Sequence, residues 1–160
     1  QQVKKSMVEE KTVPSALKTS PVDVLVEMLL ILAISYPTLW YTHVRPFFAS
    51  FSKISLYTPL YEGLDVCYNK TKIVHKDGLF PILDNLEIQK KVDMLLIKGE
   101  VEFPNISEAG AFKQGDMLYK RLVALSKRRV REDLQREIAE AEQKGDKAKV
   151  AALIKDFQNI

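Results

Sequence analysis

The sequence contains few of the residues that build most metal and catalytic sites. It has one cysteine, Cys67, and two histidines, His43 and His75, among 160 residues. A single cysteine excludes an internal disulfide and a cysteine-based zinc site, and it favours a reducing, intracellular setting. Neither histidine has another ligand-type residue at metal-binding spacing. We therefore interpret the histidines as surface or packing residues and Cys67 as a small buried hydrophobe.

Glycine is also scarce, with six residues in the chain. This leaves little material for an active-site loop, and neither G-x-x-x-x-G-K nor G-x-G-x-x-G occurs. The acidic residues are scattered, without a D-x-D pair, and no serine lies in a nucleophile elbow. We expect no enzyme active site, cofactor or metal ion within these residues.

Long apolar runs and an excess of one charge are absent too. The most apolar run, Val22 to Ile34, carries Asp23 and Glu27 and is too short to span a bilayer. It predicts a buried core helix and no membrane segment. The first 20 residues are polar and lack a signal-peptide pattern. A net charge of +3 does not by itself indicate a nucleic-acid binder.

The periodicity of the apolar residues predicts an all-α fold. We find no alternating strand pattern longer than four residues and no internal repeat. Residues 1–19 are predicted to be a linker or frayed arm, and residues 20–106 a bundle of short helices. Residues 107–160 are predicted to form a long helix followed by a C-terminal helical hairpin.

Serine, threonine, proline and glycine mark the expected helix boundaries in the bundle. Ser20-Pro21 has the N-cap and first-turn proline that begin a helix, and Tyr36 before Pro37 ends it. The aromatic residues that follow could stack on bases, but we favour a packed core. Further short helices are expected over residues 37–44, 46–51, 58–69, 78–86 and 87–98, with Gly99 ending the last and Val74 to Asp77 forming a loop.

The stretch from Ser107 to Ile160 carries two helical patterns separated by a turn. Lys144-Gly145-Asp146 combines a helix-ending glycine with an N-capping aspartate. From Asp116 to Lys144 the first helix would extend about 40 Å, and the sequence leaves open whether it bends near Gly115 or is continuous there. A continuous exposed helix of this length could exchange hairpins between two chains and give a swapped dimer.

Two alternatives compete for the charged residues of this stretch. The basic run from Lys127 to Arg131 could contact phosphates, but the acidic residues that follow at helical spacing favour local ion pairs. Apolar residues near the C-terminus remain available for a protein partner. The predicted partner-binding residues lie at the hairpin tip and on its second helix: Lys144, Lys147, Val150, Leu153, Ile154, Phe157, Gln158 and Ile160.

Several stretches together resemble the C-terminal, helicase-binding domain of bacterial DNA primase. The likeness covers about Ser20 to Ile160. It rests on the apolar helix that ends in an aromatic-Pro-x-Leu step, where Tyr36 stands in place of the family's frequent histidine. The other stretches are Glu62-Gly63-Leu64, Leu83-Asp84-Asn85-Leu86, and the closing hairpin Ile138 to Asp146 with Ala152 to Phe157.

The resemblance implies a non-catalytic, cytoplasmic bacterial domain whose hairpin docks onto the hexameric replicative DNA helicase. The zinc-binding and polymerase domains of primase, with their zinc and magnesium, would precede Gln1. Two other interpretations stay open. One is the N-terminal domain of the helicase itself, whose fold the primase domain resembles. The other is a helical nucleic-acid-binding module, which would bind less tightly as salt is added.

Overall fold

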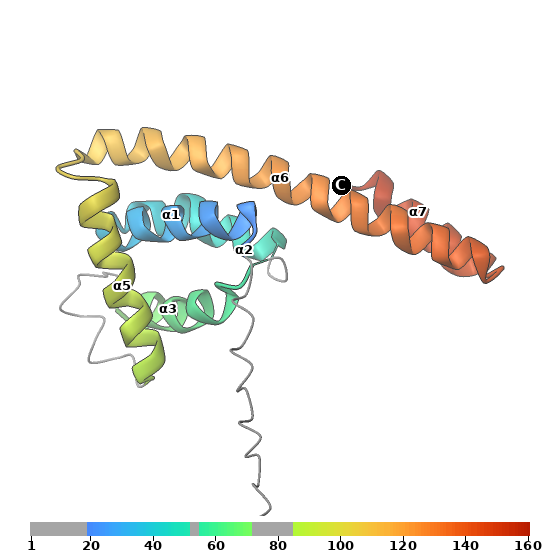
Figure 1. Ribbon diagram of the computed structural model, residues 1–160, viewed down its shortest axis with the longest axis horizontal. Coiled ribbons are helices and arrows are strands. Elements are labelled where there is room, and N and C mark those ends of the chain that lie inside the picture. The colour runs from blue at the N-terminus through green and yellow to red at the C-terminus, as the bar shows by residue number, and fades with distance from the viewer. Residues whose placement is uncertain (1–18, 52–54, 72–84) are drawn as a thin grey trace, which may run out of the picture.

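The computed structural model describes residues 19–51, 55–71 and 85–160. Within these ranges it contains six α-helices and one π-helical turn and no strand, which confirms the all-α prediction. Figure 1 shows a bundle from which one long helix projects. The predicted arm before Thr19, the loop from Val74 to Asp77 and the helix from Gly78 lie outside the described residues.

Helix α1 (Pro21–Ser35) is the centre of the bundle. The Ser20 hydroxyl accepts a hydrogen bond from the Asp23 N–H (3.2 Å), and the Asp23 carboxylate accepts one from the Ser20 N–H (3.1 Å), forming a capping box. Asp23 also accepts hydrogen bonds from the Ser55 hydroxyl and the Leu56 N–H, at 3.1 and 2.8 Å. Burial raises the pKa of Asp23, but these hydrogen bonds outweigh it and hold the pKa below its usual value. The predicted start of α1 is confirmed, and its cap ties α1 to the chain before α3 (Thr58–Thr71).

The two short helices expected on either side of Pro46 form one continuous rod. A π-helical turn, η1 (Trp40–Val44), passes directly into α2 (Arg45–Phe51). The Arg45 N–H donates to the Trp40 carbonyl, five residues earlier, so the turn is one residue wider than in an α-helix. The predicted break at Pro46 is wrong. Proline has no N–H to donate, and the wider turn lies where the α-helical ladder would be interrupted.

Aromatic side chains fill the space between this rod and α3. The Trp40 ring stacks on Tyr68 and the Phe48 ring on Tyr61, each with centroids 4.2 Å apart. Trp40, Phe48 and Tyr68 are buried, as is Phe47. These aromatic residues are therefore core, as predicted, and they do not form a surface for stacking bases.

Helix α5 (Leu86–Glu102) covers another side of α1. The Asn85 side chain caps its first turn. The predicted helix end at Gly99 is wrong, because α5 continues through Gly99 to Glu102. A Cβ atom at Gly99 would lie 2.8 Å from Cγ2 of Ile31, so the glycine allows α5 to approach α1 closely.

Helix α6 (Glu108–Gln143) is continuous over 36 residues, about 54 Å at 1.5 Å per residue. The sequence left open whether the helix bends or continues at Gly115, and in the structure it runs through this residue without a break. Gly115 is buried, and a Cβ there would lie 2.8 Å from Cδ2 of Leu39. The first half of α6 packs on α1, with Ala111, Leu118 and Leu122 in the same core. Helix α7 (Lys147–Gln158) lies alongside the distal half of α6, beyond the bundle (Figure 1).

We expect Gly115→Ala to destabilise the protein by about 1–3 kcal/mol. At an exposed helical position this substitution would stabilise by about 1 kcal/mol. At Gly115 the new methyl group meets Leu39, which is fully buried and has little room to move. Urea unfolding followed by circular dichroism measures the difference. A variant more stable than the original would contradict this expectation, because it would show that the Leu39 side chain can move to make room for the methyl group.

Candidate protein-docking surface on the C-terminal hairpin

The turn between α6 and α7 fixes the direction of the hairpin. Gly145 has a φ of 69°, a conformation that glycine adopts without strain. The Asp146 N–H donates to the Ala141 carbonyl and the Gly145 N–H to the Glu142 carbonyl, both at 3.0 Å, which is a Schellman motif. The Asp146 carboxylate then accepts the Lys149 N–H at 3.1 Å and begins α7. The predicted tight turn at residues 144–146 is confirmed.

The inner face of α7 forms a small core with α6 that is separate from the bundle core. Leu153 on α7 and Ala141 on α6 are buried, but neither belongs to the core built around α1. Helical spacing places further apolar residues on the same face of α7 as Leu153. Of the predicted docking residues, Val150, Phe157 and Ile160 are half-buried beside this core.

The other four predicted docking residues are exposed: Lys144, Lys147, Ile154 and Gln158. Within α7, Lys147, Ile154 and Gln158 are spaced i, i+7 and i+11, so they share one face of the helix. This face lies about 90° around the helix from the inner face of Val150, Leu153 and Phe157, at 100° per residue. Ile154 is at its centre and is 42% exposed. The eight predicted residues thus separate into an inner set and an outward set.

A shallow hollow of about 390 Å³ lies against the outward face. Val150, Ala151 and Ile154 form its apolar wall, and Glu142, Gly145 and Lys147 complete it. We call the exposed surface of Lys147, Ala151, Ile154 and Gln158 the hairpin flank. The sequence prediction missed Ala151. The spacing of residues 147, 151, 154 and 158 could have identified it, because all four fall on one side of a helix.

We expect Leu153→Ala to open the hairpin while the bundle stays folded. Leu153 is the buried centre of the small core between α7 and the distal half of α6. The substitution should lower the free energy of unfolding by about 2–3 kcal/mol, which is a large part of what holds so small a core together. Amide hydrogen exchange should accelerate in α7 and be unchanged in α1. Equal acceleration in both helices would show that the hairpin and the bundle unfold as one unit.

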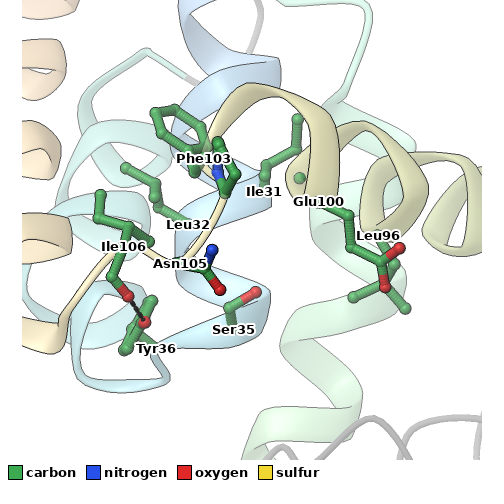
Figure 2. A pocket seen from close by; sticks show the side chains of 11 residues that line it. Ile31, Leu32, Ser35, Tyr36, Leu96, Glu100, Phe103, Asn105 and Ile106 are labelled. Atoms are coloured by element: carbon green, nitrogen blue, oxygen red, sulfur yellow. Dashed lines mark hydrogen bonds between the residues drawn. The ribbon is translucent and has the colours of Figure 1, made fainter.

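A second concave region lies between α1, α5 and the α5–α6 connector, with a volume of about 470 Å³ (Figure 2). Leu32 and Phe103 contribute apolar wall. The Tyr36 hydroxyl donates to the Ile106 carbonyl at 2.6 Å, and Asn105 turns the connector with a φ of 55°. Tyr36 therefore ties the end of α1 to the start of α6. These contacts indicate a structural role for the concave region, as the place where α1, α5 and the start of α6 are joined.

His43 is a packing histidine between η1 and α6, one of the two roles expected. Its ring makes edge contacts with Phe112 and Tyr119, and its Nδ1 lies 2.6 Å from the Thr42 hydroxyl. Nε2 lies 3.9 Å from Oδ1 of Asp116. Burial lowers the pKa of His43, although Asp116 opposes this shift by favouring the charged ring. His75 lies outside the described residues, and Cys67 is buried as predicted.

We expect His43 to titrate below the ordinary histidine value of 6.5. The unfolded chain then binds the proton more readily, so this contribution to stability is present above about pH 6.5 and is lost as the pH falls through the lower pKa of the folded state. Asp116→Asn should lower the pKa further. NMR titration of the ring protons measures it, with His75→Gln used for assignment. A pKa at or above 6.5 would contradict the burial argument.

Arg128 in the basic run of α6, and Arg136 beyond the run, form ion pairs along their own helix. Nε of Arg128 lies 2.8 Å from Oε1 of Glu132, four residues on, and Arg136 pairs with Asp133. Local pairing, the favoured interpretation of this run, is thus confirmed at Arg128. Among the described residues no group of three or more His, Cys, Asp or Glu could hold a metal ion. In that same part of the chain, no helix is both long and apolar enough to cross a membrane.

The fold defines an all-α protein with a bundle and a projecting helical hairpin. Comparison of the chain with protein-family models, with curated proteins and with solved structures finds no match in any of the three.

Proposed function

We propose that this chain is a non-catalytic docking domain that attaches a bacterial DNA primase to the hexameric replicative helicase. The observation that carries the proposal is the hairpin flank. It places Ile154 in the open, beside a hollow, on a hairpin that stands clear of the bundle. The resemblance of the sequence to the primase helicase-binding domain supplies the identity of the partner.

The hairpin flank has the composition of a small helix-docking surface. Its apolar centre is Ile154 with Ala151, and Lys147 and Gln158 supply polar groups at the ends. Interfaces commonly have such an apolar centre inside a polar rim. A helix of the helicase would lie along the hollow and cover Ile154. The inner set, centred on Leu153, would hold α7 in position and would not contact the partner.

The mechanism would be recruitment. A tether between two proteins raises the concentration of one near the other without a new chemical step. In this proposal the polymerase and zinc-binding domains, with their zinc and magnesium, belong to other parts of a longer cytoplasmic primase. The bundle would modulate the helicase on which the hairpin docks.

Two other functions are weighed against this one. The N-terminal domain of the replicative helicase would have a related fold, and it would be favoured if this chain bound a primase instead of a helicase. A nucleic-acid-binding module would use the basic run of α6. The pairing of Arg128 with Glu132 and the burial of the aromatic residues favour the protein-docking function.

We expect Ile154→Glu to weaken helicase binding at least tenfold, or about 1.4 kcal/mol, because it buries a charge at the centre of the interface. The measurement is titration calorimetry of the 160-residue chain against the helicase of the same organism. Ile154 is exposed, so circular dichroism of the variant should match that of the original protein.

Met117→Glu is the matched control. Met117 is an exposed apolar residue of α6 (57%), and it lies outside the hairpin. The Met117→Glu variant should bind the helicase like the original chain. Phe157→Ala should weaken binding only to the extent that it loosens the hairpin. Absence of binding by the folded original chain would refute the helicase proposal, and single-stranded DNA and RNA would then be tested over a salt series.

A further inference from the structure

Helix α5 carries an apolar stripe on its outer face that the described part of the bundle leaves uncovered. Its inner face packs through Val92 and Leu95, which are buried. On the other side Met94 and Ile97 are each 64% exposed and Val101 is 74% exposed. A soluble helix normally presents polar residues on that side. Three large apolar side chains in a row mark an interaction surface.

The spacing of the stripe matches the seam of a two-stranded coiled coil. Residues 94, 97 and 101 are spaced by three and four, which is the a-d-a pattern of a heptad. Lys90 occupies the preceding d position, at the N-terminal end of the stripe. The stripe is therefore suited to a second helix lying along α5.

The charged residues beside the stripe specify which helix fits. Lys91 and Lys98 flank it on one edge, and Asp93 and Glu100 flank it on the other; all four are exposed. A two-fold axis parallel to α5 brings the basic edge of one copy against the acidic edge of the other. An antiparallel pair would instead bring like edges together, lysine against lysine and carboxylate against carboxylate. Charge complementarity thus favours a parallel pair of identical helices.

We propose that the outer face of α5 is a self-association surface through which two copies of this chain pair in parallel about a two-fold axis. Met94, Ile97 and Val101 meet their counterparts in the seam. Asp93 of each copy lies near Lys98 of the other, which also pairs with Glu27 of its own chain. This surface is on a different helix from the hairpin flank, so the inference is independent of the proposed helicase docking.

The pair should be weak and sensitive to conditions. About two heptads are available, which is less apolar surface than a standard stable interface of about 1,600 Å² contains. Lys90 would meet its counterpart at the N-terminal end and must turn its ammonium group toward water. Lys90→Leu should remove this repulsion and tighten the pair at least tenfold.

Sedimentation velocity of the 160-residue chain, from about 20 µM to about 1 mM, tests the proposal. The average mass should rise toward that of a dimer as concentration increases. Ile97→Lys, which puts two ammonium groups in the seam, should remain monomeric at every concentration. Met117→Lys is the matched control: it places a lysine at a similarly exposed apolar position on α6 and should associate like the original chain. A chain that stays monomeric, or a dimer insensitive to Ile97→Lys, overturns the proposal; the second result would indicate hairpin exchange.

Two further measurements test the orientation. Salt screens attraction and repulsion alike, so a parallel pair should weaken between about 50 and 500 mM salt, and an antiparallel pair should strengthen. Val101→Cys should form a disulfide across the axis of a parallel pair in mild oxidant, and Met117→Cys should not. The native Cys67 is buried and is left in place. Stronger association in salt, or no disulfide at residue 101 in the associated protein, overturns the parallel arrangement.

Discussion

The fold depends on the burial of one helix that is apolar almost all round. Ten residues of α1, from Val22 to Ile34, are buried, and no single partner could cover them. Helix α5, the rod that begins with η1, and the first half of α6 each take one side. Removing apolar surface from water supplies the driving force for this arrangement. The close contacts at Gly99 and Gly115 follow, because neighbouring helices must approach the bundle closely enough to exclude water.

The two halves of helix α6 pack in two different cores. Its first half is part of the bundle core, and its distal half pairs with α7 in a core of its own. A hairpin whose core is separate from the bundle core must be stabilised by its turn and by a few apolar side chains. The Schellman motif at Gly145, the cap at Asp146 and the buried Leu153 meet that need. The separation leaves the flank of α7 open, so docking there would not disturb the bundle.

Local chemistry predicted the ends of helices better than the contacts between them. Ser20-Pro21 and Gly145-Asp146 could be read from the sequence because capping is decided by neighbouring residues. The roles of Gly99 and Gly115 could not be predicted from the sequence, because these glycines make room for the Ile31 and Leu39 side chains of other helices. The same limit applies to the candidate site. Spacing placed Ile154 and Leu153 in one list, and only the packing of α7 on α6 separates the outward residue from the inward one.

The two candidate surfaces lie on different helices, and their geometry bears on how they would act together. Figure 1 shows α6 running away from α5 on the side of α1, so the hairpin is far from the outer face of α5. A parallel pair through α5 would therefore send its two hairpins in opposite directions, with both flanks uncovered. Two flanks held by one weak pair could contact two subunits of a ring-shaped partner at once. The second contact would then be intramolecular, which strengthens attachment only when the spacing of the subunits matches the span of the two arms. A weak pair would suit this role, because it could form on such a partner and separate away from it.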